Sequence, residues 1–403
     1  MRPLIHCLVI GACSLLLLPV AQATEGHQLI GIGAVQKGTG GAGVASAKDA
    51  TWTMLNPAGV VRLKRRLDVG LEVFAPRRGL KPQGPLLLPM ANSRAGRMTD
   101  NSIFYIPTVS AVIPRKNYTL GIGLFGVNGL GVDYRAPRAS LGRLFGRNYD
   151  RRTEYAVAKL AIAGAHSFDN GWALGSAIHL NYARFKSDML TLGFRQTEGD
   201  NAWDDSIGIG FSLGIQKKWE RLSVGAAYTS RQWMGHLQDY SDLLGLPLDL
   251  PQIAQVGIAY DITPTLEFVA DYKFMDWSGI NQIGNEPLAG GFGWKDQHIV
   301  KSGLTWQTNE RWTLRSGVSF GNSPIDEEHV FANGLFPAIM TSHASAGFSV
   351  VLTPKTTAHF TYMHAFRNEL TDSGKGDLFS LADKGTEIWM SQNSFTFGVS
   401  YAF

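Results

Sequence analysis

The chain has 403 residues, of which 44% are hydrophobic and 46 are glycine, and its formal net charge is only +4. So small a charge gives no basis for predicting a nucleic-acid partner. Both cysteines, Cys7 and Cys13, lie in the first 23 residues, so a chain lacking that segment can form neither a disulfide nor a thiolate metal site.

Residues 1–23 have the pattern of a secretory signal peptide. Arg2 supplies positive charge, residues 4–20 are largely apolar, and Ala21-Gln22-Ala23 has the small-x-small form of a cleavage site. The apolar stretch is too short, and too close to this site, to be a spanning helix. We therefore expect cleavage at about Thr24. Lipoprotein processing at Cys13 is less favoured, because a cut there would divide the apolar stretch.

Residues 24–62 form a glycine-rich head without strand alternation. A short helix is predicted over residues 44–55, and Asn56-Pro57-Ala58-Gly59 then predicts a turn. Gly38-x-Gly40-x-x-Gly43 has the spacing of a dinucleotide-binding loop, but no strand leads into it. We interpret it as flexible backbone.

From residue 63 onward the chain contains fourteen segments in which apolar and small or polar residues alternate, the pattern of a strand with one apolar face. Most have the 9–11 residues that a tilted strand needs to cross a bilayer. They are residues 66–76, 102–113, 118–134, 154–168, 171–186, 205–217, 222–234, 252–261, 265–277, 297–308, 312–321, 343–353, 357–367 and 393–403. The last ends on the aromatic stripe Phe395, Phe397, Tyr401 and Phe403.

The connections between these segments alternate between six short turns and seven long loops. Aromatic residues cluster at the short turns, as in an interfacial girdle. They are Tyr118, Trp172, Trp219, Tyr260, Trp306 and Trp312. This rhythm predicts an all-β fold: residues 63–403 form a 14-stranded antiparallel transmembrane β-barrel with short periplasmic turns and long external loops. Residues 24–62 would then plug its lumen as a hatch.

Six charged residues fall on inward positions of these strands, where a structural ion network is the simplest role. They are Asp68, Glu72, Glu267, Asp271, Lys273 and Arg315. His298 and Ser302 share a strand face but lie about 13 Å apart, too far for a nucleophile and its base. We therefore predict no enzyme, and no metal or organic cofactor is implied.

The external loop 135–153 is rich in arginine, including Arg138, Arg143 and Arg147. Arginine at this surface can bind lipopolysaccharide phosphates by bidentate contacts. Its leucine and phenylalanine neighbours suit capture of an amphipathic substrate equally well, and a solvated charged loop is the third alternative.

The chain resembles the outer-membrane transporters of long-chain fatty acids and aromatic hydrocarbons, the FadL type. Gly26-His-Gln-Leu29 through Asn56-Pro57-Ala58 resembles the N-terminal hatch of that family. Later strands match in order. The matching stretches are Trp277-Ser278, Trp312-Thr-Leu-Arg-Ser-Gly-Val318, Asn322-Ser-Pro324 and Tyr362-Met-His364, with a terminal Phe403.

The resemblance implies capture by external loops, a pocket in the lumen, hatch movement and lateral exit at a kinked third strand. Gly129-Leu130 aligns with the kink, where glycine permits a bulge. Lys295 aligns with one basic residue of the inner pocket. Arg184 and Lys186 lie near the other, out of register, and Arg315 is a further inward-facing candidate. The incomplete match leaves open whether the substrate carries a carboxylate.

We therefore expect a monomeric channel in the outer membrane of a Gram-negative bacterium that imports hydrophobic small molecules by passive diffusion. Expected partners are the substrate, lipopolysaccharide and other outer-membrane lipid, and the barrel assembly machinery through the strand ending at Phe403. The alternatives are a plugged porin for polar solutes, and an adhesive or receptor barrel that acts through its external loops.

Overall fold

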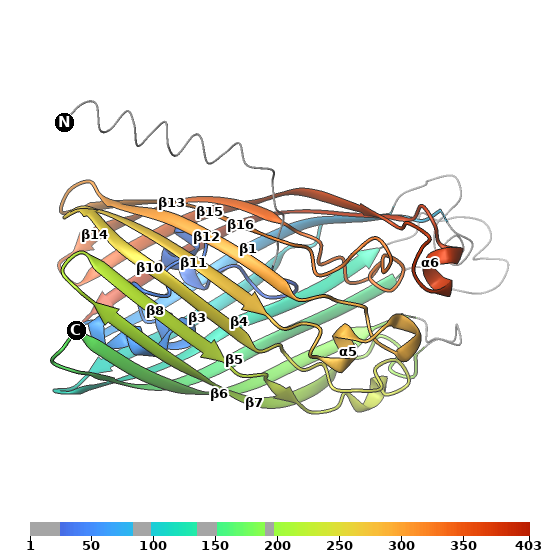
Figure 1. Ribbon diagram of the computed structural model, residues 1–403, viewed down its shortest axis with the longest axis horizontal. Helices are drawn as coiled ribbons and strands as arrows, with labels where there is room; N and C mark the ends of the chain where they lie inside the picture. The colour runs from blue at the N-terminus through green and yellow to red at the C-terminus, as the bar shows by residue number, and fades with distance from the viewer. Residues whose placement is uncertain (1–24, 84–97, 135–150, 190–196) are drawn as a thin grey trace.

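The computed structural model describes residues 25–83, 98–134, 151–189 and 197–403 (Figure 1). These residues contain sixteen strands, and fourteen of them form the wall, because β2 (Met98–Asp100) and β9 (Trp233–Met234) are short strands that each pair with one neighbour. The wall strands are β1 (Arg66–Lys81), β3 (Phe104–Pro114), β4 (Tyr118–Tyr134), β5 (Arg151–Ser167), β6 (Trp172–Ser187), β7 (Asp204–Lys218), β8 (Leu222–Thr229), β10 (Ile253–Thr263), β11 (Leu266–Met275), β12 (Gln297–Gln307), β13 (Trp312–Gly321), β14 (Ser342–Thr353), β15 (Thr356–Thr371) and β16 (Glu387–Ala402).

The sheet closes on itself. β16 pairs antiparallel with β1 from Arg66↔Ala402 to Lys81↔Glu387, so the first and last wall strands leave no free edge. The predicted all-β barrel of fourteen strands is therefore confirmed. β1, β15 and β16 run further toward the long loops than their predicted limits at residues 76, 367 and 393. The alternation fades there, but mutual pairing continues the strands.

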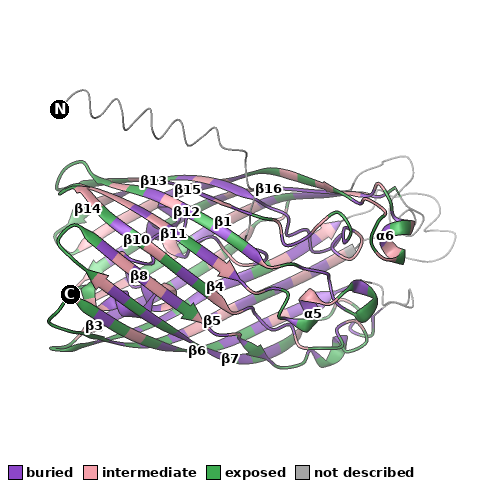
Figure 2. Ribbon diagram, viewed as in Figure 1, coloured by how far each residue is buried: buried purple, intermediate pink, exposed green. Residues whose placement is uncertain are grey.

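The outer face of the wall is apolar. In β7, Ile207, Ile209, Phe211 and Leu213 are exposed, whereas the small and polar residues between them are buried (Figure 2). All six aromatic residues expected at the short turns are exposed as well. Such a surface is stable against hydrocarbon and unstable against water. Among the described residues, no helix has both the length and the apolar character needed to cross a bilayer.

The head before β1 lies against inward-facing parts of the wall. It contains α2 (Gly33–Gly38), α3 (Trp52–Leu55) and the 3-10 turn η2 (Pro57–Arg62). α2 packs on β13 to β16 and β1, α3 on β4 and β5, and η2 on β4 to β7. The head thus contacts strands around most of the barrel, and Figure 1 shows it between them. The long loops at one end carry the short helices η4 (Gln238–Tyr240), α5 (Asn281–Gly284), η5 (Pro287–Ala289) and α6 (Leu378–Ala382).

Glycine lets the head approach the wall closely. Gly40 has a φ of +68°, and a Cβ there would lie 2.6 Å from the carbonyl oxygen of Val318 in β13. A Cβ on Gly38 would contact Arg315 at 3.1 Å. The Gly38-x-Gly40-x-x-Gly43 spacing therefore serves packing in this fold.

Inward-facing carboxylates of the wall hold the head in place. Glu72 pairs with Lys37 at 2.8 Å, and Glu267 pairs with Lys48 at 2.8 Å. Asp271 accepts hydrogen bonds from the backbone N–H groups of Gly43 (2.8 Å) and Val44 (2.9 Å), and Asp68 accepts one from Ala50 at 2.8 Å. The charged positions that the sequence places inside the barrel are thus the contacts between wall and head.

A candidate passage through the barrel wall

The wall opens between β3 and β4. Their ladder extends from Pro114↔Thr119 only as far as Thr108↔Phe125. Beyond that point, residues 104–107 of β3 pair with β1, on the far side from β4. Residues 126–134 of β4 pair with β5, and this ladder contains a β-bulge at Val127. A bulge bends its strand and ends regular pairing, so β4 turns away from β3. Toward the long loops β2 limits the gap, where the Asp100 carboxylate accepts a hydrogen bond from the Asp133 N–H at 3.2 Å.

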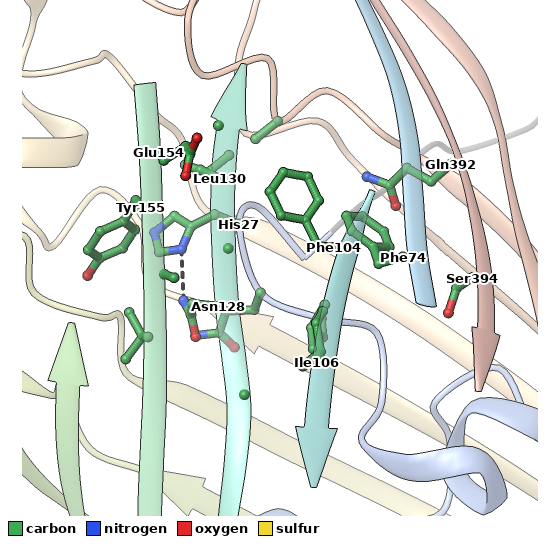
Figure 3. Close-up of a pocket in the computed structure, with 18 of the residues that line it drawn as sticks. His27, Phe74, Phe104, Ile106, Asn128, Leu130, Glu154, Tyr155, Gln392 and Ser394 are labelled. Atoms are coloured by element: carbon green, nitrogen blue, oxygen red, sulfur yellow. Dashed lines mark hydrogen bonds between the residues drawn. The ribbon is translucent and has the colours of Figure 1, made fainter. Parts of the chain in front are cut away.

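A cavity of about 370 Å³ fills this gap. Figure 3 shows Phe74, Phe104 and Ile106 on one side of it and His27, Leu130 and Tyr155 on the other. Its lining also includes side chains of the outer face: Tyr105, Pro107, Ala156, Ala158 and Tyr182. Because residues of both faces line one continuous space, the cavity passes through the wall. A 150 Å³ apolar cavity already binds benzene, so this one is large enough for a small hydrocarbon.

The outer face beside the gap is built from small residues. Gly126 and Gly129 of β4 and Ala156 and Ala158 of β5 line the cavity there, whereas lower on β4 the outward positions are the exposed Leu120, Ile122 and Leu124. A Cβ on Gly129 would meet nothing closer than the Tyr155 carbonyl oxygen at 3.9 Å. The outer opening of the cavity, here called its mouth, is therefore not blocked by large side chains at these four positions.

Residues 25–29, here called the strap, run along the edge of β4 that β3 leaves free. The Leu29 N–H donates to the Val127 carbonyl at 3.2 Å, and the Gly129 N–H donates to the His27 carbonyl at 3.1 Å. The Asn128 side chain bonds the His27 ring at 2.8 Å (Figure 3). Two backbone hydrogen bonds and one side-chain contact thus hold the strap at the gap.

The other end of the strap lies among lysines. Glu25 pairs with Lys273 of β11 at 2.5 Å and with Lys301 of β12. Burial opposes its ionisation, but the two ammonium groups lower the pKa of Glu25 to about 2. Burial lowers the pKa of His27 to about 3, so its ring, packed on Trp277 with 4.7 Å between centroids, is neutral.

A second, smaller cavity of about 70 Å³ borders the lysines. Lys159 of β5, Lys273 and Lys301 line it together with Glu25. Lys159 is buried and makes no hydrogen bond or ion pair with any residue that the structure describes. Gln28, Leu29 and Asn128 line both cavities, so the strap and its β4 contact form the partition between them.

The predicted binding residues lie in three places. Lys295 contributes to neither cavity: its side chain is 64% exposed in a long loop and pairs with Asp326 of the next long loop. Arg315 is half-buried against α2, where it donates to Ser349 at 2.5 Å, also away from both cavities. Only the pair on β6 lies near the passage.

Arg184 lines the outer mouth of the large cavity. Its guanidinium lies 4.4 Å from the ring centroid of Trp203, and its Nε donates to Asp205 at 3.2 Å. Lys186 stands over the same indole at 4.3 Å and lies 3.4 Å from Glu154. Arg184 and Lys186 therefore mark the exterior rim and do not reach the interior. Their role in substrate binding remains a prediction.

The remaining predicted residues are placed as follows. Gly129 and Leu130 line the passage, and the bulge itself is two residues earlier, at Val127. The Asn56 side chain accepts the Ala58 N–H at 3.1 Å and donates to the Val44 carbonyl at 2.7 Å. Pro57 and Ala58 lie against Gly175 of β6, where a Cβ would be 2.5 Å from each backbone. Arg138, Arg143 and Arg147 lie outside the described residues.

Sequence reasoning missed two of the three lysines that line the small cavity, Lys159 and Lys301. Lys159 and Lys301 occupy inward positions of predicted strands, so strand parity could have identified both, as it did Lys273. Glu25 and His27 gave no such signal, because their neighbours are distant in sequence. Among the described residues, no group of three or more His, Cys, Asp or Glu side chains is arranged to hold a metal ion.

Comparison with known proteins agrees with this architecture. The family model described as outer membrane protein transport protein (OMPP1/FadL/TodX) matches residues 19–403. The long-chain fatty acid transport protein of Escherichia coli O6:H1 is 20% identical over 311 residues, which cover 63% of this chain and 68% of that protein. The protein of the same name from Salmonella typhi is 24% identical over 221 residues, covering 50% of this chain and 47% of its own length.

Two solved structures have the same fold. The toluene transporter TodX of Pseudomonas putida superposes with a TM-score of 0.72 at 17% identity, covering 93% of this chain and 99% of its own. A Pseudomonas aeruginosa FadL homologue superposes with a TM-score of 0.71 at 14% identity, covering 94% and 100%.

Proposed function

Because the chain belongs to the OMPP1/FadL/TodX family of outer membrane transport proteins, we propose that it is a passive channel that admits hydrophobic small molecules. We propose that they leave sideways, through the gap between β3 and β4. The observation that carries this proposal is the 370 Å³ cavity lined by residues of both faces of the wall.

The physical chemistry of the substrate favours this route. An alkyl chain gains about 0.8 kcal/mol for each CH₂ removed from water, so it enters an apolar cavity readily and leaves it for water slowly. The head occupies the axial route, whereas the gap between Tyr105 and Ala156 faces the exterior directly. A lateral exit delivers the molecule to the membrane without a passage through water.

The substrate class follows from the two cavities together. The relatives are named for long-chain fatty acids and toluene, which differ in whether a carboxylate is present. Here the large cavity is bordered mainly by apolar side chains, and the small one has three lysines for one carboxylate. We propose that amphiphiles with an anionic head and an apolar tail are the preferred substrates, and that neutral hydrocarbons also pass.

The remaining expectations form part of the same proposal. Cleavage at about Thr24 would leave Glu25 near the start of the mature chain. The basic external loop with Arg138, Arg143 and Arg147 would contact lipopolysaccharide or incoming substrate. The barrel would be a monomer assembled through the strand that ends at Phe403.

The test is uptake by cells that lack their own fatty acid channel and either express this protein or carry an empty vector. We expect the expressing cells to take up labelled oleate faster than the control cells, and labelled toluene faster as well. If expressing and control cells took up oleate at the same rate, and also took up toluene at the same rate, transport would be refuted. The porin alternative is tested in planar bilayers, where a steady large conductance would favour it, because the head leaves no open axial route in the proposed channel.

A further inference from the structure

One wall of the large cavity carries a buried histidine without a hydrogen-bond partner. His343, at an inward position of β14, is 2% exposed and lines the cavity. Neither of its ring nitrogens makes a hydrogen bond with any residue that the structure describes. Unpaired polar atoms in a protein interior are unfavourable and uncommon. His343 therefore has unused hydrogen-bonding capacity at the edge of a space that can hold a ligand.

Strand register places a second polar side chain at the same level. His343 pairs with Ala365 of β15, and Ala365 pairs with Gln392 of β16, so the three inward residues form one row. Neighbouring strands lie about 4.8 Å apart, which puts the Cα atoms of His343 and Gln392 roughly 10 Å from each other. Ala365 lines the cavity between them, and its single methyl group leaves room for a ligand group.

The Gln392 amide is also largely unused. Within the part of the chain that the structure describes, its one hydrogen-bond contact is from Nε2 to the Met390 sulfur at 3.7 Å, and a thioether is a weak acceptor. Figure 3 shows Gln392 on the same side of the cavity as Phe74 and Phe104. The polar end of this row thus adjoins apolar lining.

The row is suited to a neutral polar group. A buried imidazole without a carboxylate partner is most stable uncharged, with one N–H donor and one acceptor nitrogen. Glu25 acts electrostatically on His343, but its two oxygens face Lys273 and Lys301. The Gln392 amide offers N–H donors and a carbonyl acceptor. A hydroxyl group is both donor and acceptor, so it matches this pair of side chains, whereas an alkyl group does not.

We propose that His343 and Gln392 form a subsite for the hydroxyl group of a neutral substrate, an alcohol or a phenol. The hydroxyl donates to the acceptor nitrogen of His343 and accepts from the Gln392 amide, and the apolar body lies against Phe74 and Phe104. Both ring nitrogens are covered in this structure, so binding includes a rotation of the ring toward Ala365. This inference rests on the proposed function, since it adds a class of substrate to those of the channel.

The subsite is separate from the lysines of the small cavity. Lys159, Lys273 and Lys301 do not line the large cavity, and neither His343 nor Gln392 lines the small one. An anionic head and a hydroxyl group are therefore bound at different parts of the bore. His343 is by this argument a specificity-determining residue, because it favours oxygenated molecules over hydrocarbons of the same shape.

The test compares p-cresol with p-xylene, which have nearly the same shape and differ by a hydroxyl in place of a methyl group. Binding to detergent-purified protein is measured by displacement of a fluorescent hydrophobic probe, with partitioning into protein-free micelles subtracted. His343→Phe should weaken p-cresol binding about five- to tenfold, the loss expected for one net hydrogen bond, and change p-xylene binding by less than about twofold.

The matched control is Ser345→Ala. Ser345 is the next inward residue of β14 and is buried, but it contacts the head and does not line the cavity. Its replacement should change the binding of neither ligand. If it weakened p-cresol binding as much as His343→Phe does, the effect would belong to β14 in general and the subsite would be refuted.

A second variant and a third ligand make the outcome decisive. Gln392→Met keeps the length of the side chain and removes its amide, so it should weaken p-cresol binding about threefold and leave p-xylene binding unchanged. Binding of p-toluate should be unaffected by His343→Phe, and a selective loss of p-toluate would show that the ring is charged and would overturn the proposal. Heat-modifiable mobility on gels reports folding, and if His343→Phe fails to fold, Gln392→Met decides alone.

Two results would overturn the subsite: equal changes for p-cresol and p-xylene in the folded variants, or no change for either ligand. Uptake by cells is scored separately, because binding is measured on purified protein. A selective loss of p-cresol binding without oleate or toluene uptake by the parent would refute transport alone. Normal uptake without that selective loss would refute the subsite alone.

Discussion

A disulfide between the strap and β4 should close the passage reversibly. Gln28 and Asn128 are bridge partners, and the bonds on either side run from Leu29 to Val127 and from Gly129 to His27. This is the pattern of a pair without hydrogen bonds of its own, in which the Cα atoms lie about 4.5 Å apart. Disulfides accept Cα separations of about 4.4–6.8 Å, so Gln28→Cys with Asn128→Cys should oxidise without moving the backbone.

The expected magnitude follows from the geometry. Once bonded, the two Cα atoms cannot separate beyond about 7 Å, so the strap cannot leave β4. Uptake should then fall in proportion to the fraction of oxidised molecules, about tenfold when about nine-tenths are cross-linked. In the reduced state the variant loses only the bond between Asn128 and His27, which contributes roughly 1 kcal/mol, and uptake should stay near the parent rate.

The assay is oleate uptake by cells expressing the double variant, measured after oxidation and again after a reductant. Cross-linking is quantified in the same cells by mass spectrometry of the joined peptides. Each single cysteine variant serves as a control, because it carries the substitution and cannot form the bridge. If fully cross-linked protein transported oleate as fast as reduced protein, the strap would not be the gate.

Three further outcomes are expected. Gly129→Leu should cut uptake several-fold, because the new side chain narrows the outer opening of the cavity. Folding should be kept, since a Cβ at this position meets nothing closer than 3.9 Å. The matched control is Gly164→Leu, at an exposed position of β5 where a Cβ meets nothing within 4 Å. Asn56→Ala should loosen the head by about 1–3 kcal/mol, measured as faster hydrogen exchange in residues 43–62. The contact between the two long loops that carry Glu286 and His329 should weaken at high pH, because the hydrogen bond that His329 donates to Asp326 raises the pKa of His329 to about 9 against the effect of burial.

The sign of the pH effect follows from linkage. The pKa of His329 lies above its ordinary value of 6.5 in the folded loop, so its stabilising contribution is complete below pH 6.5 and is lost as pH rises through about 9. Burial opposes ionisation of Asp326, but the bond to His329 holds its pKa below 3.8, and that contribution is lost in acid. Hydrogen exchange of residues 322–341, corrected for intrinsic rates, should therefore accelerate between about pH 6 and pH 10.

Three results would count against these expectations. Equal loss of uptake in Gly129→Leu and Gly164→Leu would indicate a general defect of the barrel. Unchanged exchange in the Asn56→Ala head would mean that the turn is held by packing on Gly175 alone. If the corrected hydrogen-exchange rates of residues 322–341 did not change with pH, His329 would not be holding the two loops together.

Strand positions were predictable because each depends on a short-range rule. A strand in a membrane barrel must present apolar side chains on every second position. The alternation in residues 205–217 therefore predicts β7 (Asp204–Lys218) without reference to any other segment. The same rule assigned Asp68, Glu72 and Asp271 to the interior. It could not say what they contact, because Lys37, Gly43 and Ala50 lie in a segment without periodicity.

The passage was only partly predictable. The Gly129-Leu130 pair in β4 indicated an irregularity in the strand. A bulge, however, is defined by the register with the neighbouring strand β5, and that register places it at Val127. Lys295 shows the limit of alignment by short motif. The residue falls in a loop where Asp326 pairs with it, and the interior cations come instead from Lys159, Lys273 and Lys301.

By itself the sequence determined a closed barrel of fourteen strands with a separate head, because alternation and turn chemistry act between near neighbours in the chain. Only the tertiary structure decided where the wall opens and what partitions the opening. The strap meets β4 a hundred residues away, and Glu25 meets Lys273 and Lys301 across the bore. Contacts at such separations depend on barrel closure and strand register, which no local pattern encodes.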